Sequence, residues 1–253
     1  MGGYFADTGV SVTVFNIAPE GSVTGSAVVS LGPSQLRIGA RQGEASFYDG
    51  KLCYQEWQSC NSCHPFYRPD GLNWILGGGT VVSPKNTKSM VNSWWTYPPN
   101  WAGRHGGPRQ SIIAGIELQL YRTPTQELIK PLDTLFMRMK PVPSPYLEKG
   151  RLSAAALRGK TLYYNKDKVD CIVCHPPPLF TDNLCWNTAI PDPFDATIQW
   201  YTPDLPEAWR TASYGHLGSM TLREIVELPT HSNASKNLTP QEIDDLLAYV
   251  LSL

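Results

Sequence analysis

The sequence of 253 residues lacks any run of about 18 consecutive apolar residues, so we expect no segment to cross a membrane. Charge is also scarce: charged residues make up 17% of the chain, and the net charge is −1. Because there is neither a basic excess nor an acidic block, the composition favours neither nucleic-acid binding nor an acidic tail. Glycine and proline stay below the roughly 25–30% that is typical of disordered chains. We therefore expect a globular chain with a hydrophobic core.

Cysteine occurs only six times, but four of these residues form two C-x-x-C-H motifs. The motifs are Cys60-Asn61-Ser62-Cys63-His64 and Cys171-Ile172-Val173-Cys174-His175. C-x-x-C-H is the attachment signature of a c-type haem. Residues i and i+3 share one face of a helical turn, so both thiols reach the vinyl groups of one porphyrin while the adjacent imidazole meets the iron. The sequence predicts two covalently bound haem c groups, with His64 and His175 as proximal ligands.

Other uses of cysteine remain as alternatives. A zinc ribbon normally separates its two C-x-x-C pairs by roughly 15–20 residues, whereas Cys63 and Cys171 are 108 positions apart. A thioredoxin-like dithiol needs a βαβ context and does not predict two copies. The remaining pair, Cys53 and Cys185, forms either a disulfide or two buried free thiols.

The location of the protein follows from the haem prediction. Haem c is attached outside the cytoplasm, where disulfides also persist. We therefore expect a periplasmic or otherwise extracytoplasmic protein of bacterial type. No charged segment followed by a long apolar stretch stands at the start of the sequence, so no signal peptide is visible.

The two motifs belong to an internal repeat. Residues 42–49 and 158–165 each precede a C-x-x-C-H motif, and each reads as an amphipathic helix with an early glycine, at an offset of 116 residues. Thr123 and Thr239 begin a second pair of expected helices at the same offset. Each start has Thr as N-cap, Pro next, and Gln or Glu three residues after the Thr, which is a capping box. We expect these helices to end near Met139 and at Leu253.

Each half therefore reads as a helix, a haem motif, a long loop and a C-terminal helix. This plan predicts a mainly α fold of two tandem c-type cytochrome domains, each wrapping one covalent haem, with a short N-terminal β segment. Alternation over residues 10–15 and the apolar residues 28–31 indicate the strands. The predicted divisions are a strand-rich arm (1–35), a first cytochrome domain (36–140), a Pro-rich linker (141–150) and a second cytochrome domain (151–253).

Six further segments carry a family resemblance: 43–48, 57–60, 70–74, 84–89, 141–146 and 221–224. Together they make residues 36–253 resemble the di-haem cytochrome c peroxidase and MauG superfamily. The likeness is strongest to the cytochrome part that follows a YVTN-type β-propeller in bacterial exported proteins. Residues 4–17 resemble the edge of one propeller repeat.

For the second haem, the resemblance places the distal ligand in or just after the helix that follows residues 214–218. His231 follows that expected helix and is the preferred candidate. Met220 has suitable chemistry but precedes the helix, and His216 resembles a family histidine between the haems or beside a propionate. The choice matters because a filled sixth position favours electron transfer, whereas an open one allows chemistry at the iron.

For the first haem, no distal partner is obvious, and Met90 and His105 are the nearest candidates. Met90 aligns with a packing position that Leu205 occupies in the second half. The resemblance assigns to Trp101 the place of a tryptophan between the haems that aids electron passage, with ordinary core packing as the alternative. It assigns to Glu117, at a shorter spacing than the family's, a distal carboxylate for peroxide proton transfer. The alternative for Glu117 is a solvated helix carboxylate.

The resemblance also implies one Ca²⁺ between the domains. Asn86 matches the residue that binds it through a side chain, and Thr211 and Ser213 match the positions that bind through backbone oxygens. The family usually has proline where Ser213 stands. Hard oxygen ligands suit calcium.

These expectations combine into a di-haem c-type cytochrome that carries electrons between redox partners, alone or as a subunit of a larger oxidoreductase. The alternative is a hydrogen-peroxide-reducing di-haem peroxidase, or a MauG-like oxidase, with an open first haem. We expect redox proteins as partners. We also expect another subunit or a β-propeller to pair with the N-terminal arm, because an unpaired strand edge recruits another strand.

Overall fold

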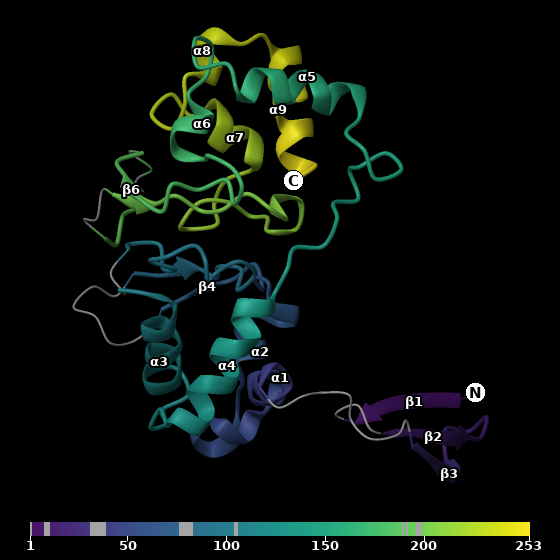
Figure 1. Ribbon diagram of the computed structural model, residues 1–253. Helices are drawn as coiled ribbons and strands as arrows, with labels where there is room; N and C mark the ends of the chain where they lie inside the picture. Colours follow the sequence, from purple (N-terminus) through teal and green to yellow (C-terminus); the bar gives the residue numbers. More distant parts are fainter. Residues whose placement is uncertain are drawn as a thin grey trace.

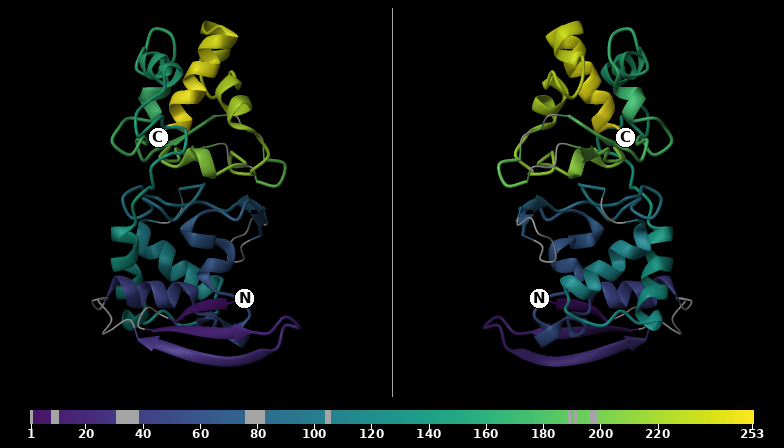
Figure 2. Two further views of the ribbon diagram at one scale, coloured as in Figure 1. Left: turned by 90° about the vertical axis from the view of Figure 1, so that its right-hand side faces the viewer. Right: turned by 90° about the vertical axis from the view of Figure 1, so that its left-hand side faces the viewer.

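The computed structural model describes residues 2–7, 11–30, 39–75, 83–103, 106–188, 190, 192–195 and 199–253. Two helical halves, residues 39–139 and residues 151–253, are stacked on each other, and a small N-terminal sheet lies beside the first (Figures 1 and 2). Within the described part of the chain, every helix is too short or too polar to cross a bilayer.

The two halves repeat one helical plan. Three helices of the first half begin at residues 40, 108 and 126, and their counterparts begin at 154, 222 and 240, so each pair is 114 residues apart. The helices of the first half are α1 Ala40–Tyr48, α2 Cys60–Cys63, α3 Pro108–Leu118 and α4 Gln126–Arg138. Those of the second half are α5 Ala154–Tyr163, α6 Cys171–Cys174, α7 Leu222–Glu227, α8 Ala234–Asn237 and α9 Pro240–Leu251. Four 3₁₀ turns complete the set: Gly50–Leu52, Tyr54–Glu56, Pro65–Tyr67 and Ala208–Arg210.

The start of α4 differs from the sequence prediction. We expected Thr123 as N-cap with a capping box, but the helix begins at Gln126 behind an extended Thr125, without a box. Thr125 provides a second hydroxyl residue at which the helix can begin. The pKa of Glu127 is lowered because its carboxylate accepts hydrogen bonds from its own backbone N–H and from the Thr125 side chain. The predicted box is present at α9, where Thr239 and Glu242 accept each other's backbone N–H groups.

Two glycines allow the helices of each half to cross closely. Helix α1 packs on α4, and α5 packs on α9. A Cβ added to Gly43 would meet the carbonyl oxygen of Pro131, and one added to Gly159 would meet that of Asp245, in both cases closer than the 3.0 Å that real Cβ contacts keep. Glycine is therefore required at both crossings by backbone-to-backbone contact.

Each crossing lies in its own hydrophobic core. Burial of such side chains contributes roughly 1.5–3 kcal/mol each. The first core contains Phe47, Ile112, Ile116, Ile129, Leu132, Leu135 and Phe136. The second contains Ala156, Tyr163, Val169, Ala208, Val226, Ala234, Leu238, Ile243, Leu246, Tyr249 and Val250.

A small hairpin in each half faces the other half. Strand β4 (Asn73–Trp74) pairs with β5 (Lys85–Asn86), and β6 (Cys185–Trp186) pairs with β7 (Trp200–Tyr201). In each, the indole N–H of the tryptophan donates to an aspartate four residues earlier, at 2.7 Å: Trp74 to Asp70 and Trp186 to Asp182. This D-x-L-x-W repeat was overlooked in the sequence, although both copies are visible there.

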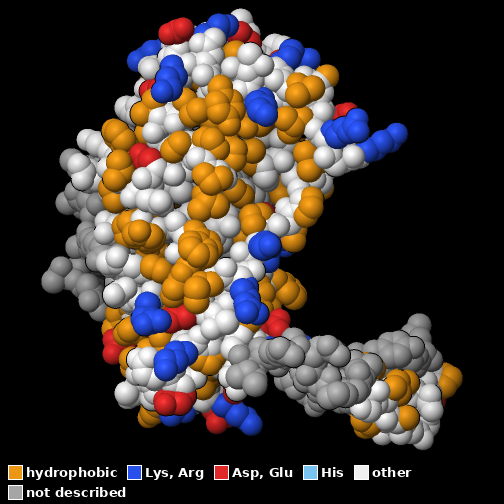
Figure 3. Space-filling model, in the orientation of Figure 1, with side chains coloured by type: hydrophobic (Ala, Val, Ile, Leu, Met, Phe, Trp, Pro, Cys, Tyr) orange, Lys and Arg blue, Asp and Glu red, His pale blue; other side chains and the backbone are white. Residues whose placement is uncertain are grey.

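Polar contacts join the two halves. Arg68 forms two hydrogen bonds, of 2.8 and 2.7 Å, with the fully buried carboxylate of Glu207, which also accepts the backbone N–H of Val142 in the linker. Lys85 Nζ lies 2.7 Å from the buried carboxylate of Asp192. Apolar side chains extend across both halves on the face shown in Figure 3.

The N-terminal sheet is an antiparallel meander in the order β1-β2-β3. Its strands are Gly2–Asp7, Ser11–Ile17 and Val23–Ser30. The two strands expected from the sequence correspond to β2 and β3, whereas β1 was not expected. Val23, Val28 and Val29 expose half or more of their surface, so β3 has little core to support it.

Candidate haem-binding sites

The two C-x-x-C-H motifs adopt the same local structure. Each pair of cysteines bounds a single helical turn, α2 or α6, and the following histidine ends it by donating its backbone N–H to the first cysteine's carbonyl. All six cysteines are free thiols in the structure. Burial raises the pKa of Cys60 and of Cys171 to about 12, which opposes the thiolate that a reactive redox dithiol needs. The described residues also contain no cluster of three or more His, Cys, Asp or Glu suited to a metal ion.

Both predicted proximal histidines are oriented by a backbone carbonyl. The Nδ1 of His64 lies 2.9 Å from the carbonyl oxygen of Lys88, and the Nδ1 of His175 lies 2.9 Å from that of Phe180. Such a bond places the proton on Nδ1 and leaves Nε2 for a metal. Burial lowers the pKa of both imidazoles to about 4, so both are neutral at pH 7. A neutral imidazole with a fixed ring is the form that binds iron.

A largely apolar cavity of about 370 Å³ opens beside the second motif. This volume lies in the range of small-molecule and cofactor sites. Cys171, Cys174 and His175 line one side, and residues of α7, the α7–α8 turn and α9 line another. The wall residues include Tyr163, Trp186, Tyr201, Leu222, Ile225, Val226, His231, Leu246 and Val250.

His231 lies across this cavity from His175. The two ring centroids are 6.3 Å apart, with the ring planes at 65°. Metal–nitrogen bonds are about 2.0–2.1 Å, and an imidazole centre lies about 1.1 Å beyond its nitrogen, so two imidazoles on opposite sides of one metal have centroids about 6.3 Å apart. The spacing of the two rings is therefore compatible with both imidazoles binding one metal ion. Burial lowers the pKa of His231, which keeps it neutral as well.

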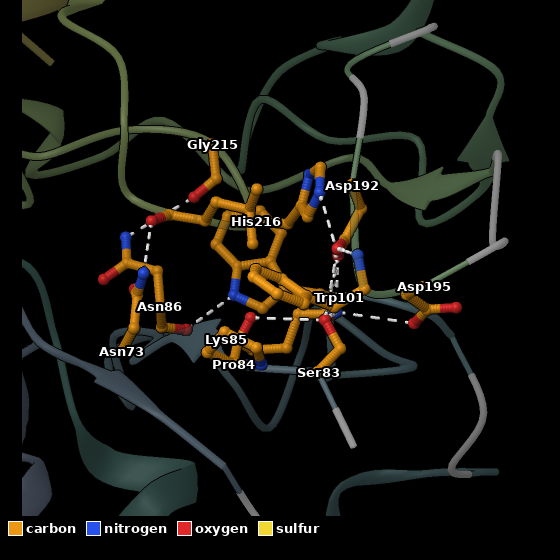
Figure 4. Close-up of polar contacts among 12 residues, drawn as sticks. Asn73, Ser83, Pro84, Lys85, Asn86, Trp101, Asp192, Asp195, Gly215 and His216 are labelled. Atoms are coloured by element: carbon orange, nitrogen blue, oxygen red, sulfur yellow. Dashed lines mark hydrogen bonds and ion pairs between the residues drawn. The ribbon is translucent and has the colours of Figure 1, made fainter. Parts of the chain in front are cut away.

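The two other distal candidates of the second half differ in position: Met220 lies outside the cavity wall, whereas His216 is part of it. Met220 pairs with Tyr214 in an isolated β-bridge and is not among the residues that line the cavity. His216 is 1% exposed and stacks on Trp200 with centroids 3.7 Å apart. Its Nε2 lies 3.4 Å from Asp192 Oδ2, in the cluster that Lys85 joins (Figure 4).

In the first half, the predicted residues are more scattered. Met90 packs against the core beside Cys60, as expected of a packing position. His105 lies outside the described residues. Glu117 is exposed near the end of α3. Trp101 donates its indole N–H to the Asn86 carbonyl oxygen at 2.7 Å and lines the cavity that contains His175.

The candidate calcium ligands come partly together. Asn86 is buried and reaches across to the second half, where its Nδ2 lies 2.8 Å from the Ser213 carbonyl oxygen and 3.5 Å from that of Gly215 (Figure 4). Its Oδ1 is buried without a hydrogen-bond partner. Thr211 instead bonds to Ala208. An orphaned amide oxygen beside two carbonyls fits a hard cation once the amide is turned.

Cys53 and Cys185 do not form the predicted disulfide in this structure. Cys53 is fully buried in the segment that follows α1. Cys185 stands in β6 of the second half, where its Sγ lies close to Gly103. The second reading, two free thiols, is the one that the structure has, although Cys185 is only partly buried.

Comparisons with known proteins agree with these features. No protein-family model matches the chain. The methylamine utilization protein MauG of Methylophilus methylotrophus is 23% identical over 273 residues, a match covering 85% of this chain and 82% of that protein.

Solved structures share the fold. Hydrazine synthase from Kuenenia stuttgartiensis matches with a TM-score of 0.72 at 21% identity, over 85% of this chain and 87% of that one. A MauG-like protein associated with microbial copper homeostasis matches with a TM-score of 0.65 at 20% identity, over 89% and 91%. The diheme peroxidase BthA from Burkholderia thailandensis, as its Y463M variant, matches with a TM-score of 0.56 at 16% identity, over 84% and 85%. With its two C-x-x-C-H motifs and this shared fold, the chain is similar to proteins of the di-haem cytochrome c peroxidase and MauG superfamily.

Proposed function

We propose that this protein is a di-haem c-type cytochrome that carries electrons between redox partners. The observation that carries the proposal is the His175–His231 pair, 6.3 Å apart across a buried cavity. Bound haem would supply one-electron chemistry at iron. His175 and His231, two neutral imidazoles that line the cavity, would both bind that iron. The second site is therefore suited to electron transfer.

Trp101 supports a route between the halves. It contacts Asn86 of β5 through its indole N–H, and its carbonyl accepts the backbone N–H of Tyr201 in β7. Two residues along from Asn86, Lys88 accepts from His64. Trp101 therefore links the strand that leads to the first proximal histidine with the cavity of the second.

An electron-exchange assay tests this function. When a reduced small c-type cytochrome is mixed with the oxidised protein in the absence of peroxide, we expect the small cytochrome to be oxidised. We expect the haems of this protein to be reduced by the same number of electrons. Stopped-flow absorbance at the haem bands measures the transfer. If the small cytochrome stays reduced until peroxide is added, the carrier function is wrong and the peroxidase alternative is favoured.

The peroxidase alternative has an observation of its own. Glu117 and His231 each stand nine residues before the start of the last helix of their half. Glu117 lies within α3 and His231 follows α7, and these two helices begin 114 residues apart. Glu117 is thus the counterpart of the second site's distal histidine. A carboxylate at that position moves protons rather than blocking the iron, as peroxide reduction at an open first haem requires.

If the alternative holds, Glu117→Gln is expected to reduce the peroxide turnover rate by about 10²–10⁴-fold, because one general acid–base group is removed. Glu127→Gln, which changes an exposed carboxylate on neighbouring α4, is the control and is expected to leave the rate unchanged. Equal rates in wild type and Glu117→Gln would remove Glu117 from the mechanism.

We also propose that a Ca²⁺ ion binds where Asn86 meets the 211–215 loop. Asn86→Ala is expected to weaken Ca²⁺ binding at least tenfold, because it removes the side-chain oxygen. Isothermal titration of the haem-loaded protein with CaCl₂ measures the affinity. Asn73→Ala is the control, since Asn73 also bonds across the halves, to the Leu217 carbonyl, but from an exposed position. Absence of Ca²⁺ binding by the wild type would refute the site.

The attachment chemistry of haem c supports an extracytoplasmic location, and exposed apolar surface supports docking of redox partners.

The predicted domain divisions remain proposals: an arm over 1–35, cytochrome domains over 36–140 and 151–253, and a linker over 141–150. Pairing of the arm with a sheet of another subunit or a β-propeller is also a proposal, supported by the unpaired edge strands of the meander.

A further inference from the structure

One lysine occupies the contact between the two candidate haem sites. The backbone carbonyl of Lys88 holds His64, the proximal histidine of the first site, at 2.9 Å. Its side chain extends the other way, so that Nζ lies 5.0 Å from the ring centroid of Trp101 and 4.3 Å from that of Tyr201. Lys88 also lines the cavity that contains His175. A single residue therefore reaches both sites.

The internal repeat indicates that this positive charge is not needed for the fold. Thr87-Lys88-Ser89-Met90 in the first half corresponds to Thr202-Pro203-Asp204-Leu205 in the second, 115 residues later. Pro203 stands where Lys88 stands, whereas the carbonyl that holds His175 in the second half is that of Phe180. An uncharged residue thus occupies this position of the second half, and the ammonium group is specific to the first.

The charge of Lys88 is not cancelled by a close carboxylate. Lys85, three residues earlier, is paired with Asp192 at 2.7 Å. For Lys88, no carboxylate oxygen among the described residues lies within 4.0 Å of Nζ, and the nearest acidic influence is the buried Asp204, which accepts a hydrogen bond from Asn92 at 2.9 Å. The aromatic faces of Trp101 and Tyr201 stabilise the ammonium in this position.

We propose that Lys88 is a tuning residue that raises the reduction potentials of the haem sites by holding a positive charge between them. A fixed charge in a poorly screened interior favours the state with one more electron, and the field falls off only slowly there. The same charge, placed over the ring of Trp101, opposes removal of an electron from that ring. Lys88 therefore favours electrons on the haems and disfavours a hole on the tryptophan between them. This inference rests on the proposed di-haem function.

The test is a spectroelectrochemical titration, at pH 7, of haem-loaded wild type, Lys88→Gln and Lys88→Arg. Lys88→Gln is expected to lower the midpoint potential of at least one haem by a tenfold change in its one-electron equilibrium, or about 59 mV. Lys88→Arg keeps the charge and is expected to restore most of the wild-type value. Lys51→Gln, which removes an exposed lysine from the first half, is the control and is expected to change neither potential.

A second variant tests the same field in the opposite direction. Asp204→Asn removes a negative charge that acts on Lys88 while keeping an oxygen for Asn92, so it is expected to raise a potential. If Lys88→Gln fails to take up haem, the potentials of Asp204→Asn test the role of the Lys88 charge instead. Wild type with two one-electron steps, but with potentials that neither variant moves, would overturn the role of Lys88 alone. Wild type without two reducible haems would overturn the proposed function itself.

Discussion

His231→Gly is expected to convert the second haem from a low-spin to a high-spin form. The substitution removes the imidazole that lies 6.3 Å, centroid to centroid, from His175. The other described histidine in the cavity wall, His216, is stacked on Trp200 and lies beside Asp192. An open sixth position then binds water or an added ligand. Optical and magnetic circular dichroism spectra of the oxidised protein report the spin state. Added imidazole is expected to restore the low-spin spectrum.

Met220→Leu is the matched control for that experiment. Met220 was the second candidate from the sequence, and the structure places it in a bridge with Tyr214 instead of in the cavity wall. We expect its spectrum to equal that of the wild type. A high-spin form in Met220→Leu, together with an unchanged spectrum in His231→Gly, would identify the methionine as the ligand and reject the histidine.

Gly159→Ala is expected to destabilise the second half by about 3 kcal/mol or more, toward the upper end for overpacking. The added Cβ would overlap the backbone carbonyl of Asp245 on α9, and backbone cannot move aside as a flexible side chain does. Because α5 and α9 form one wall of the second core, haem uptake at the second motif is expected to fall as well. Chemical denaturation followed by circular dichroism measures the loss.

Gly115→Ala is the control for the glycine experiment. Gly115 lies inside α3, and a Cβ there meets nothing within 4 Å. Replacing a helical glycine by alanine in open space stabilises by about 0.5–1 kcal/mol. If Gly159→Ala were as stable as Gly115→Ala, the close α5–α9 crossing would be wrong.

The C-x-x-C-H turns and the helix pairs were predictable from the sequence because their signals are local. C-x-x-C-H needs only one helical turn. The early glycines at 43 and 159 were visible as part of the repeat, and the structure shows that the helices of each half cross there. Helix α4 shows the limit: two threonines, Thr123 and Thr125, compete as N-cap, and the sequence pattern favours the wrong one. A cap depends on the backbone geometry that the rest of the half imposes.

Contacts between the halves were beyond sequence reasoning. Arg68 and Glu207 are 139 residues apart, and no local pattern connects them. The position of Lys88 was missed for the same reason, because its charge matters only once Trp101 and Tyr201 enclose it. One signal was present: aligning the repeated halves places Lys88 opposite Pro203, which marks a residue that the shared fold does not require.

Low-temperature EPR of the oxidised wild-type protein, with iron counted per chain on the same sample, tests the central claim most directly. We expect two irons per chain and one low-spin ferric signal from a haem with two axial histidines, His175 and His231. The EPR signal of the first haem then separates the two functions. A second low-spin signal favours the electron carrier, whereas a high-spin signal favours the peroxidase alternative. Fewer than two irons per chain, or two high-spin haems and no low-spin signal, would contradict the account.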